Sequence, residues 1–98
     1  MPKPPKAVRK AARDALDARA KAPPSQRGMG PVGLARARDL SNGRELSRET
    51  IERMFSFLSR HEVDKAGETW SRKGKGWQAW NGWGGDAGLA WVKGILGK

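Results

Sequence analysis

The stretch GWQAWNGWGGDAGLAW, residues 76–91, holds four of the five tryptophans of this 98-residue chain. Its indoles could stack exposed nucleobases or form the core of a small domain. The chain has no tyrosine and only two phenylalanines, so little else is large enough to close a core. Burial of an aromatic side chain contributes about 1.5 to 3 kcal/mol, which a short chain cannot easily forgo. We therefore expect Trp77, Trp80, Trp83 and Trp91 to be core residues and Trp70 to be the candidate base-stacking residue.

The same stretch predicts two helices that meet at Gly84 and Gly85. These glycines allow a sharp bend above Trp83, and Asp86 is expected to cap the helix that follows. A phosphate loop is the less favoured interpretation, because the stretch lacks the GK[ST] ending and Asp86 would repel a phosphate. In the last helix Trp91, Ile95 and Leu96 are expected to face inward.

Upstream of the tryptophans, start and stop signals predict further helices. Pro31 suits a first helical position, Asn42-Gly43 can end that helix, and Ser47 is a good N-cap for the next. No segment alternates with the period of a strand. The expected helices cover residues 6–22, 31–41, 48–62, 77–83 and 87–96, and the buried stripe of the third is Ile51, Met54, Phe55 and Leu58. The predicted class is all-α: a compact bundle of about four short helices over residues 31–98.

Residues 1–30 are interpreted as a basic helical arm followed by a linker rich in proline and glycine. The apolar stripe of the helix over 6–22 is thin, so we expect it to dock lightly and to be removable without unfolding the domain. Three ion pairs are expected along it: Lys10–Asp14, Arg13–Asp17 and Asp17–Lys21.

The string HEVDK, residues 61–65, is the most enzyme-like motif. A zinc-protease helix needs a second histidine four residues after the first, but the chain has one histidine, His61. Glu62, Asp64 and Asp86 could serve a magnesium nuclease, although solvated carboxylates are the default reading. We expect Val63 to enter the core, and we expect no catalytic residue, no metal and no cofactor.

Charge points to a polyanionic partner. Twenty basic side chains against ten acidic ones give a net charge of +10. The chain has no cysteine, and it lacks both an apolar run long enough to span a bilayer and the apolar middle of a secretion signal. These features predict a soluble protein of a reducing compartment, with no membrane contact.

The blocks ARARDL (residues 35–40), HEVDK (61–65) and WGGDAG (83–88) together resemble a small domain of tailed bacteriophages and prophages. Such domains occur alone or attached to head-assembly and DNA-handling proteins. The resemblance covers about two-thirds of the chain and implies a phage context, in the cytoplasm of the infected bacterium or in the virion. It supplies no catalytic residue.

Two functions of different classes follow. The first is a nonenzymatic phage accessory protein that binds nucleic acid through its phosphates, with DNA favoured over RNA. A helix-turn-helix over 31–62 is disfavoured, because Glu49 and Glu52 lie where base contacts would be made. The candidate phosphate-binding residues are Lys6, Arg9, Lys10, Arg13, Arg36, Arg38, Arg44, Arg48, Arg72, Lys73 and Lys75. The alternative is a structural or assembly component of the phage particle that acts through protein–protein contacts. The charges could also be merely solvated.

Overall fold

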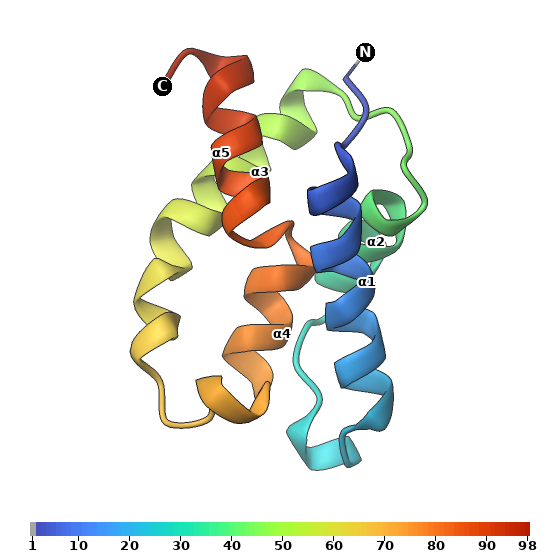
Figure 1. Cartoon of the computed structure of the whole chain (residues 1–98), viewed down its shortest axis with the longest axis vertical. Helices are drawn as coiled ribbons and strands as arrows, with labels where there is room; N and C mark the ends of the chain where they lie inside the picture. Colours follow the sequence, from blue (N-terminus) through green and yellow to red (C-terminus); the bar gives the residue numbers. More distant parts are fainter. Residues whose placement is uncertain (1) are drawn as a thin grey trace.

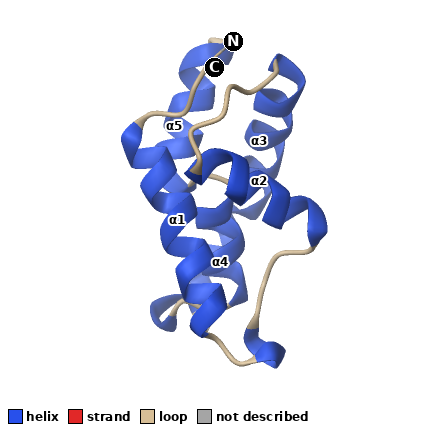
Figure 2. Cartoon of the chain, turned by 90° about the vertical axis from the view of Figure 1, so that its right-hand side faces the viewer, coloured by secondary structure: helices blue, strands red, loops and turns tan. Residues whose placement is uncertain are grey.

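The computed structural model of the protein describes residues 2–98, and this part of the chain is helical without any strand (Figure 2). Its α-helices are α1 (Lys6–Lys21), α2 (Pro31–Ser41), α3 (Arg48–His61), α4 (Lys75–Gly82) and α5 (Gly85–Leu96). Short 3-10 helices occupy the connections: η1 (Pro24–Gln26), η2 (Glu62–Ala66) and η3 (Trp70–Arg72). The predicted all-α class is confirmed.

The helices pack as two groups that share one core (Figure 1). α1 packs against both α2 and α4, and α3 packs against α5. Contacts of α1 with α5 join the two groups, and η2 covers another side of α4. Every α-helix contributes to the core, whose buried members are Val8, Ala12, Leu40, Leu46, Ile51, Met54, Leu58, Trp80, Trp83 and Val92.

The tryptophans divide differently from the prediction. Trp80 and Trp83 are buried core residues, 2% and 8% exposed, as expected. Trp91 is half-buried against the core, and so is Trp70, which was expected to be the exception. Trp77, expected in the core, is half-buried and lies outside the core cluster. Trp77 is therefore the one tryptophan that neither belongs to the core cluster nor packs against it.

The expectation that the first helix docks lightly is wrong, because α1 is an integral part of the bundle. Val8, Ala12 and Ala15 are fully buried against their neighbours. Pro4 is buried as well, and the backbone oxygen of Pro2 accepts a 2.9 Å hydrogen bond from the amide of Leu46. Alanines lack bulk but let helices approach closely, so a stripe that looks thin in sequence still makes a tight interface.

The connection over residues 23–30 is held by a buried glutamine of α4. The side-chain oxygen of Gln78 accepts from the amide of Gly28 at 2.7 Å, and its Nε2 donates to the backbone oxygens of Gln26 and Lys73 at 3.2 and 3.0 Å. Arg19 Nε also donates to the backbone oxygen of Gly28 at 2.8 Å. A segment that reads as a linker in sequence is thus bonded to the body of the fold.

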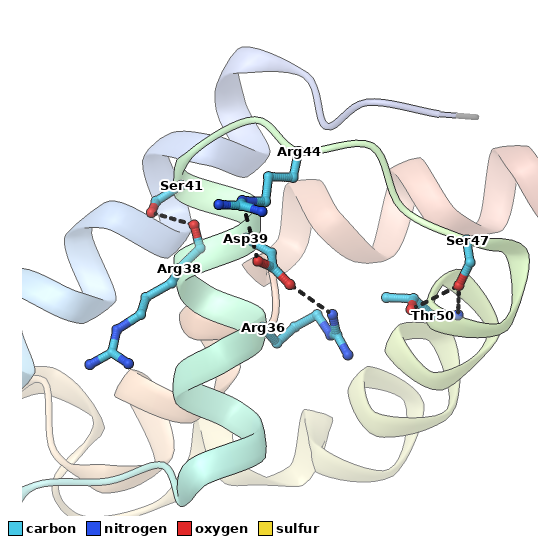
Figure 3. Close-up of polar contacts among 7 residues, drawn as sticks. All are labelled: Arg36, Arg38, Asp39, Ser41, Arg44, Ser47 and Thr50. Atoms are coloured by element: carbon cyan, nitrogen blue, oxygen red, sulfur yellow. Dashed lines mark hydrogen bonds and ion pairs between the residues drawn. The ribbon is translucent and has the colours of Figure 1, made fainter.

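The predicted helix signals around α2 and α3 are largely confirmed. Pro31 is the first residue of α2, and the amide of Thr50 donates to the hydroxyl of Ser47 at 3.2 Å, so Ser47 caps α3 (Figure 3). Of the pair predicted to end α2, only Gly43 is left-handed, with φ of +68°, whereas Asn42 keeps a right-handed conformation.

The bend between α4 and α5 forms where it was predicted. Gly84 and Gly85 have φ angles of +114° and +65°, a backbone region that favours glycine. The predicted cap is wrong, however, because α5 begins at Gly85 and has no side-chain cap. Asp86 lies inside the first turn of the helix and bonds to Trp80 instead.

Val63 was expected in the core, but its side chain is 76% exposed. It follows Leu58 by five residues, which on a continued helix places it about 140° from the buried stripe. The chain also tightens there into η2. Position 63 thus faces solvent.

Candidate nucleic-acid interface

The predicted phosphate-binding residues fall into groups that differ in whether a carboxylate neutralises them. Arg36 and Arg44 share Asp39: Arg36 Nη1 lies 3.5 Å from one carboxylate oxygen, and Arg44 Nε lies 3.7 Å from the other (Figure 3). Arg38, on the same helix, is exposed and points away from Asp39 (Figure 3). Of these arginines of α2 and its C-terminal turn, only Arg38 presents its charge without such a partner.

Arg36 is built into the wall of the core. Its side chain is 13% exposed, and the guanidinium carbon lies 5.6 Å from the ring centroid of Trp83. Its Nε is buried without a hydrogen-bond partner. Arg36 therefore serves as a cation over an indole face more than as a surface charge.

The start of α3 carries compensated charges. Arg48 Nε lies 3.4 Å from Glu52, and Arg53 Nη2 lies 2.7 Å from Glu49. In addition, α2 packs against α1 and α4 while α3 packs against α5, so α2 and α3 are not assembled as a reading unit. This arrangement is unlike a helix-turn-helix.

The outer face of α1 gathers four predicted cations and one carboxylate, Asp14, around a hollow of about 360 Å³. We call this set, Lys6, Arg9, Lys10 and Arg13, the α1 cation row. Lys10 Nζ pairs with Asp14 at 2.7 Å, as predicted. The pairs predicted for Asp17 are not formed within 4.0 Å in the described chain, and Lys6, Arg9 and Arg13 have no carboxylate partner there.

A second cationic group lies where the C-terminal end of α1 meets η3. Lys21, Arg72 and Lys73 line a hollow of about 280 Å³, and we call these residues the basic corner. Arg72 and Lys73 also border an adjoining hollow of about 400 Å³ that includes Thr69. Lys21 is more than 50 positions away from its neighbours in sequence. No local pattern could have assigned it to this group.

A hollow of about 640 Å³, larger than the three above, lies between η2, η3, α4, the end of α3 and the 23–30 connection. We call it the aromatic hollow, after Phe57, His61, Trp70 and Trp77, which line it together with Arg27 and Lys75 among others. Lys73 Nζ lies 5.2 Å from the ring centroid of Trp77, and Thr69 borders both this hollow and the one beside the basic corner. The structure thus brings together the candidates Trp70, Lys73 and Lys75 and adds Trp77, which sequence reasoning had assigned to the core.

A stack of rings ends at this hollow. Phe57 stacks on Trp83 with ring centroids 4.5 Å apart, and His61 in turn stacks on Phe57 with centroids 4.2 Å apart. Asp64 Oδ2 lies 3.2 Å from His61 Nδ1 and holds the orientation of the imidazole. The stack runs from the core outward, and His61 is its outermost ring.

The carboxylates considered for a magnesium nuclease are engaged elsewhere. Lys65 Nζ lies 2.7 Å from Asp86 and 3.8 Å from Glu62, while Asp64 contacts His61. A hydrogen bond from Lys65 holds the pKa of Asp86 below its usual value, partly opposed by desolvation and reinforced by the lysine charge and the indole of Trp80. Within residues 2–98, no group of three or more His, Asp or Glu side chains is placed to hold a metal ion.

Across residues 2–98, no helix combines the length and the apolar character that crossing a bilayer requires. Comparison with protein-family models, curated proteins and solved structures finds no match to this chain.

Proposed function

We propose that this chain is a nonenzymatic bacteriophage accessory protein that binds nucleic acid mainly through phosphate contacts. The observation that carries the proposal is the α1 cation row, whose four cations share one hollow with a single carboxylate, Asp14. Asp14 pairs with Lys10, and Lys6, Arg9 and Arg13 have no carboxylate partner in the described chain. The phage context comes from the sequence resemblance.

The spacing of these cations suits a charged polymer. Side chains three or four residues apart on a helix lie on one face, about 5 to 6 Å apart at their Cβ atoms. Lys6, Arg9 or Lys10, and Arg13 follow that spacing over successive turns of α1. A row of this kind can contact neighbouring phosphates of one strand together and release the counterions condensed on them.

The basic corner extends the same helix. Lys21 lies at the last residue of α1, and Arg72 and Lys73 reach the same hollow from η3 and the residue after it. The 16 residues of α1 span about 24 Å at the helical rise per residue. The cation row and the basic corner therefore lie toward opposite ends of this helix, with Asp14 and Asp17 between them, and the distance lets them contact separate phosphates of one strand.

The compensated start of α3 favours sequence-independent binding. Glu49 and Glu52 pair with Arg53 and Arg48, which leaves no free cationic helix start for base-edge contacts. Affinity is expected to be similar on unrelated sequences and to fall steeply with salt.

A charge-matched pair of variants tests the proposal. The row variant carries Lys6→Gln, Arg9→Gln and Arg13→Gln, and the control carries Arg60→Gln, Lys93→Gln and Lys98→Gln on α3, on α5 and at the end of the chain. Both lose the same charge. Affinities on two unrelated duplexes are measured across a salt series, after melting curves show that both variants are folded.

The row variant is expected to lose affinity on both duplexes alike. The slope of log affinity against log salt should fall by roughly 0.9 for each lost duplex contact. The control should lose much less. Equal slopes for the two variants would remove α1 from the binding surface. Unchanged DNA binding together with failure to enter purified phage particles would favour the alternative, a structural component that acts through protein contacts.

A further inference from the structure

We infer that the aromatic hollow receives an unpaired nucleobase of a single-stranded segment whose phosphates lie on the neighbouring cations. This inference rests on the proposed function and adds the form of nucleic acid that the chain prefers. It is carried by the rings that line the hollow, by the position of Trp77 and by the charges around the rim.

The hollow has the size and lining of a site for a small planar group. Its volume of about 640 Å³ falls within the range of roughly 300 to 1,000 Å³ typical of small-molecule sites. Trp70, Trp77, Phe57 and His61 supply flat apolar surfaces, and stacking on such rings is the usual way in which single strands are held.

The stack of aromatic rings ends at a surface on which a bound base could stack. Trp83, Phe57 and His61 follow one another at 4.5 and 4.2 Å, with interplanar angles of 14° and 22°. The series starts in the core and ends at His61, which borders the hollow and is oriented by Asp64. A planar base in the hollow can add one more ring to a stack that is already ordered, at little entropic cost.

Trp77 is the side chain that packing alone does not explain. It lies on α4 outside the core cluster, although Trp80 of the same helix is fully engaged in the core. Its ring lies 5.2 Å from Lys73 Nζ and borders the hollow. An indole beside a lysine is the pairing that single-strand sites use, the ring for the base and the ammonium for the phosphate.

The charges around the hollow favour a polymer over an uncharged planar ligand. Arg27 and Lys75 line it, and neither is paired with a carboxylate in the described chain; the one carboxylate of the lining, Asp64, contacts His61. Lys73 belongs both to the basic corner and to the surroundings of Trp77, so the basic corner at the end of α1 adjoins the rim of the hollow. Charge complementarity thus selects a strand whose backbone follows the cations while one base enters the hollow.

The test compares full-length protein with Trp77→Leu, which keeps apolar bulk, and Trp77→Phe, which keeps a ring. Each binds a single-stranded oligonucleotide and a fully paired hairpin of equal length at fixed salt. Trp77→Leu is expected to lower single-strand affinity by about 5- to 150-fold, the range for loss of one base–aromatic stack. Trp77→Phe should lose clearly less, and hairpin affinity should change little in both.

Photo-crosslinking of wild-type protein to an oligonucleotide that carries 5-iodouracil keeps the test valid if Trp77→Leu does not fold. Crosslinks are expected at Trp70, Trp77 or His61. Crosslinks confined to α1, or equal single-strand affinity of folded Trp77→Leu and wild type, would overturn the base site while leaving phosphate binding intact. Absence of binding to either nucleic acid at low salt would overturn both the inference and the proposed function, and would leave the hollow to a side chain of a protein partner.

Discussion

The indole Nε1 of Trp80 donates a hydrogen bond of 3.0 Å to Oδ1 of Asp86, across the glycine bend that separates α4 from α5. Lys65 Nζ reaches the same oxygen at 2.7 Å and lies 4.8 Å from the Trp80 ring centroid. One carboxylate thus joins α4, α5 and η2. The polar edge of the largest core residue is satisfied at the surface while its ring remains buried.

Trp80→Ala should lower the free energy of unfolding by about 3 to 5 kcal/mol, because it removes a nearly fully buried indole and leaves a cavity. Such a loss is a large share of the stability of a small domain. Trp91→Ala should cost less, because Trp91 is only half-buried. Urea unfolding followed by circular dichroism measures both. A wild-type midpoint in Trp80→Ala would contradict the core assignment.

Asp86→Asn should reveal a pH-dependent contribution to stability. The pKa of Asp86 in the folded state lies below its usual value of 3.8, chiefly because Lys65 donates a hydrogen bond to it. The carboxylate therefore stabilises the fold fully above the unfolded pKa, and this contribution is lost as pH falls through the folded pKa.

The effect should be small, below about 1 kcal/mol, because the pair is exposed to solvent screening. Urea unfolding gives the free energies of unfolding of wild type and Asp86→Asn at about pH 6 and about pH 2.5. The difference between the two proteins at each pH isolates Asp86, because the other carboxylates titrate in both proteins. The wild-type advantage should be present at the higher pH and largely absent at the lower. An advantage that does not change with pH would contradict this account.

Gln78→Leu should destabilise the protein by at least about 2 kcal/mol, because it leaves the amide of Gly28 and the backbone oxygens of Gln26 and Lys73 without their partner. Hydrogen exchange at Gly28 should accelerate. Gln26→Leu is the matched control, since Gln78 bonds only to its backbone oxygen. Similar losses in the two variants would mean that the glutamine bonds do not hold the 23–30 connection.

Gly84→Ala and Gly94→Ala should shift stability in opposite directions. At Gly84, φ is +114° and an added Cβ would lie 2.9 Å from the Cα of Gly88, so destabilisation of at least about 1 kcal/mol is expected. At Gly94, inside α5, an added Cβ meets nothing within 4 Å. Alanine there should stabilise by up to about 1 kcal/mol. Thermal melts that shift in the same direction would contradict the assigned bend.

Deletion of residues 1–24 should abolish cooperative unfolding, because it removes Val8, Ala12 and Ala15 from the interior. The charge-only row variant should melt close to wild type, since Lys6 and Arg13 are exposed and glutamine retains part of the half-buried stem of Arg9 beside Gly43. Circular dichroism melts of both proteins separate the structural role of α1 from its charge. A truncated protein with a cooperative wild-type transition would restore the interpretation of α1 as a lightly docked arm.

Local signals account for what could be predicted. Helix periodicity, Pro31 at a helix start, the Ser47 cap and the Gly84-Gly85 bend each depend on residues that are adjacent in sequence. These signals act within one or two turns of helix, so the local structure that they favour does not depend on contacts with distant segments. Burial of Trp80 and Trp83 follows as well, because the chain has too few other large apolar side chains to form a core.

The candidate site depends on neighbours that no local pattern supplies. Whether Arg36 faces solvent or the indole of Trp83 is decided by how α4 packs beside α2. The position of Trp77 at the hollow has the same origin, because the packing of α4 against the core determines which of its indoles is buried and which lies at the edge.

An all-helical fold and a strong positive charge could be read from the sequence, since helix propensity, capping and composition are properties of contiguous residues. Three features became visible only in the folded chain: α1 belongs to the core, Gln78 holds the 23–30 connection, and Lys21 lies beside Arg72 and Lys73. The reason is physical: close packing of alanines, a buried hydrogen-bond network and the proximity of charges are relations between distant segments, and these relations exist only when the segments pack together.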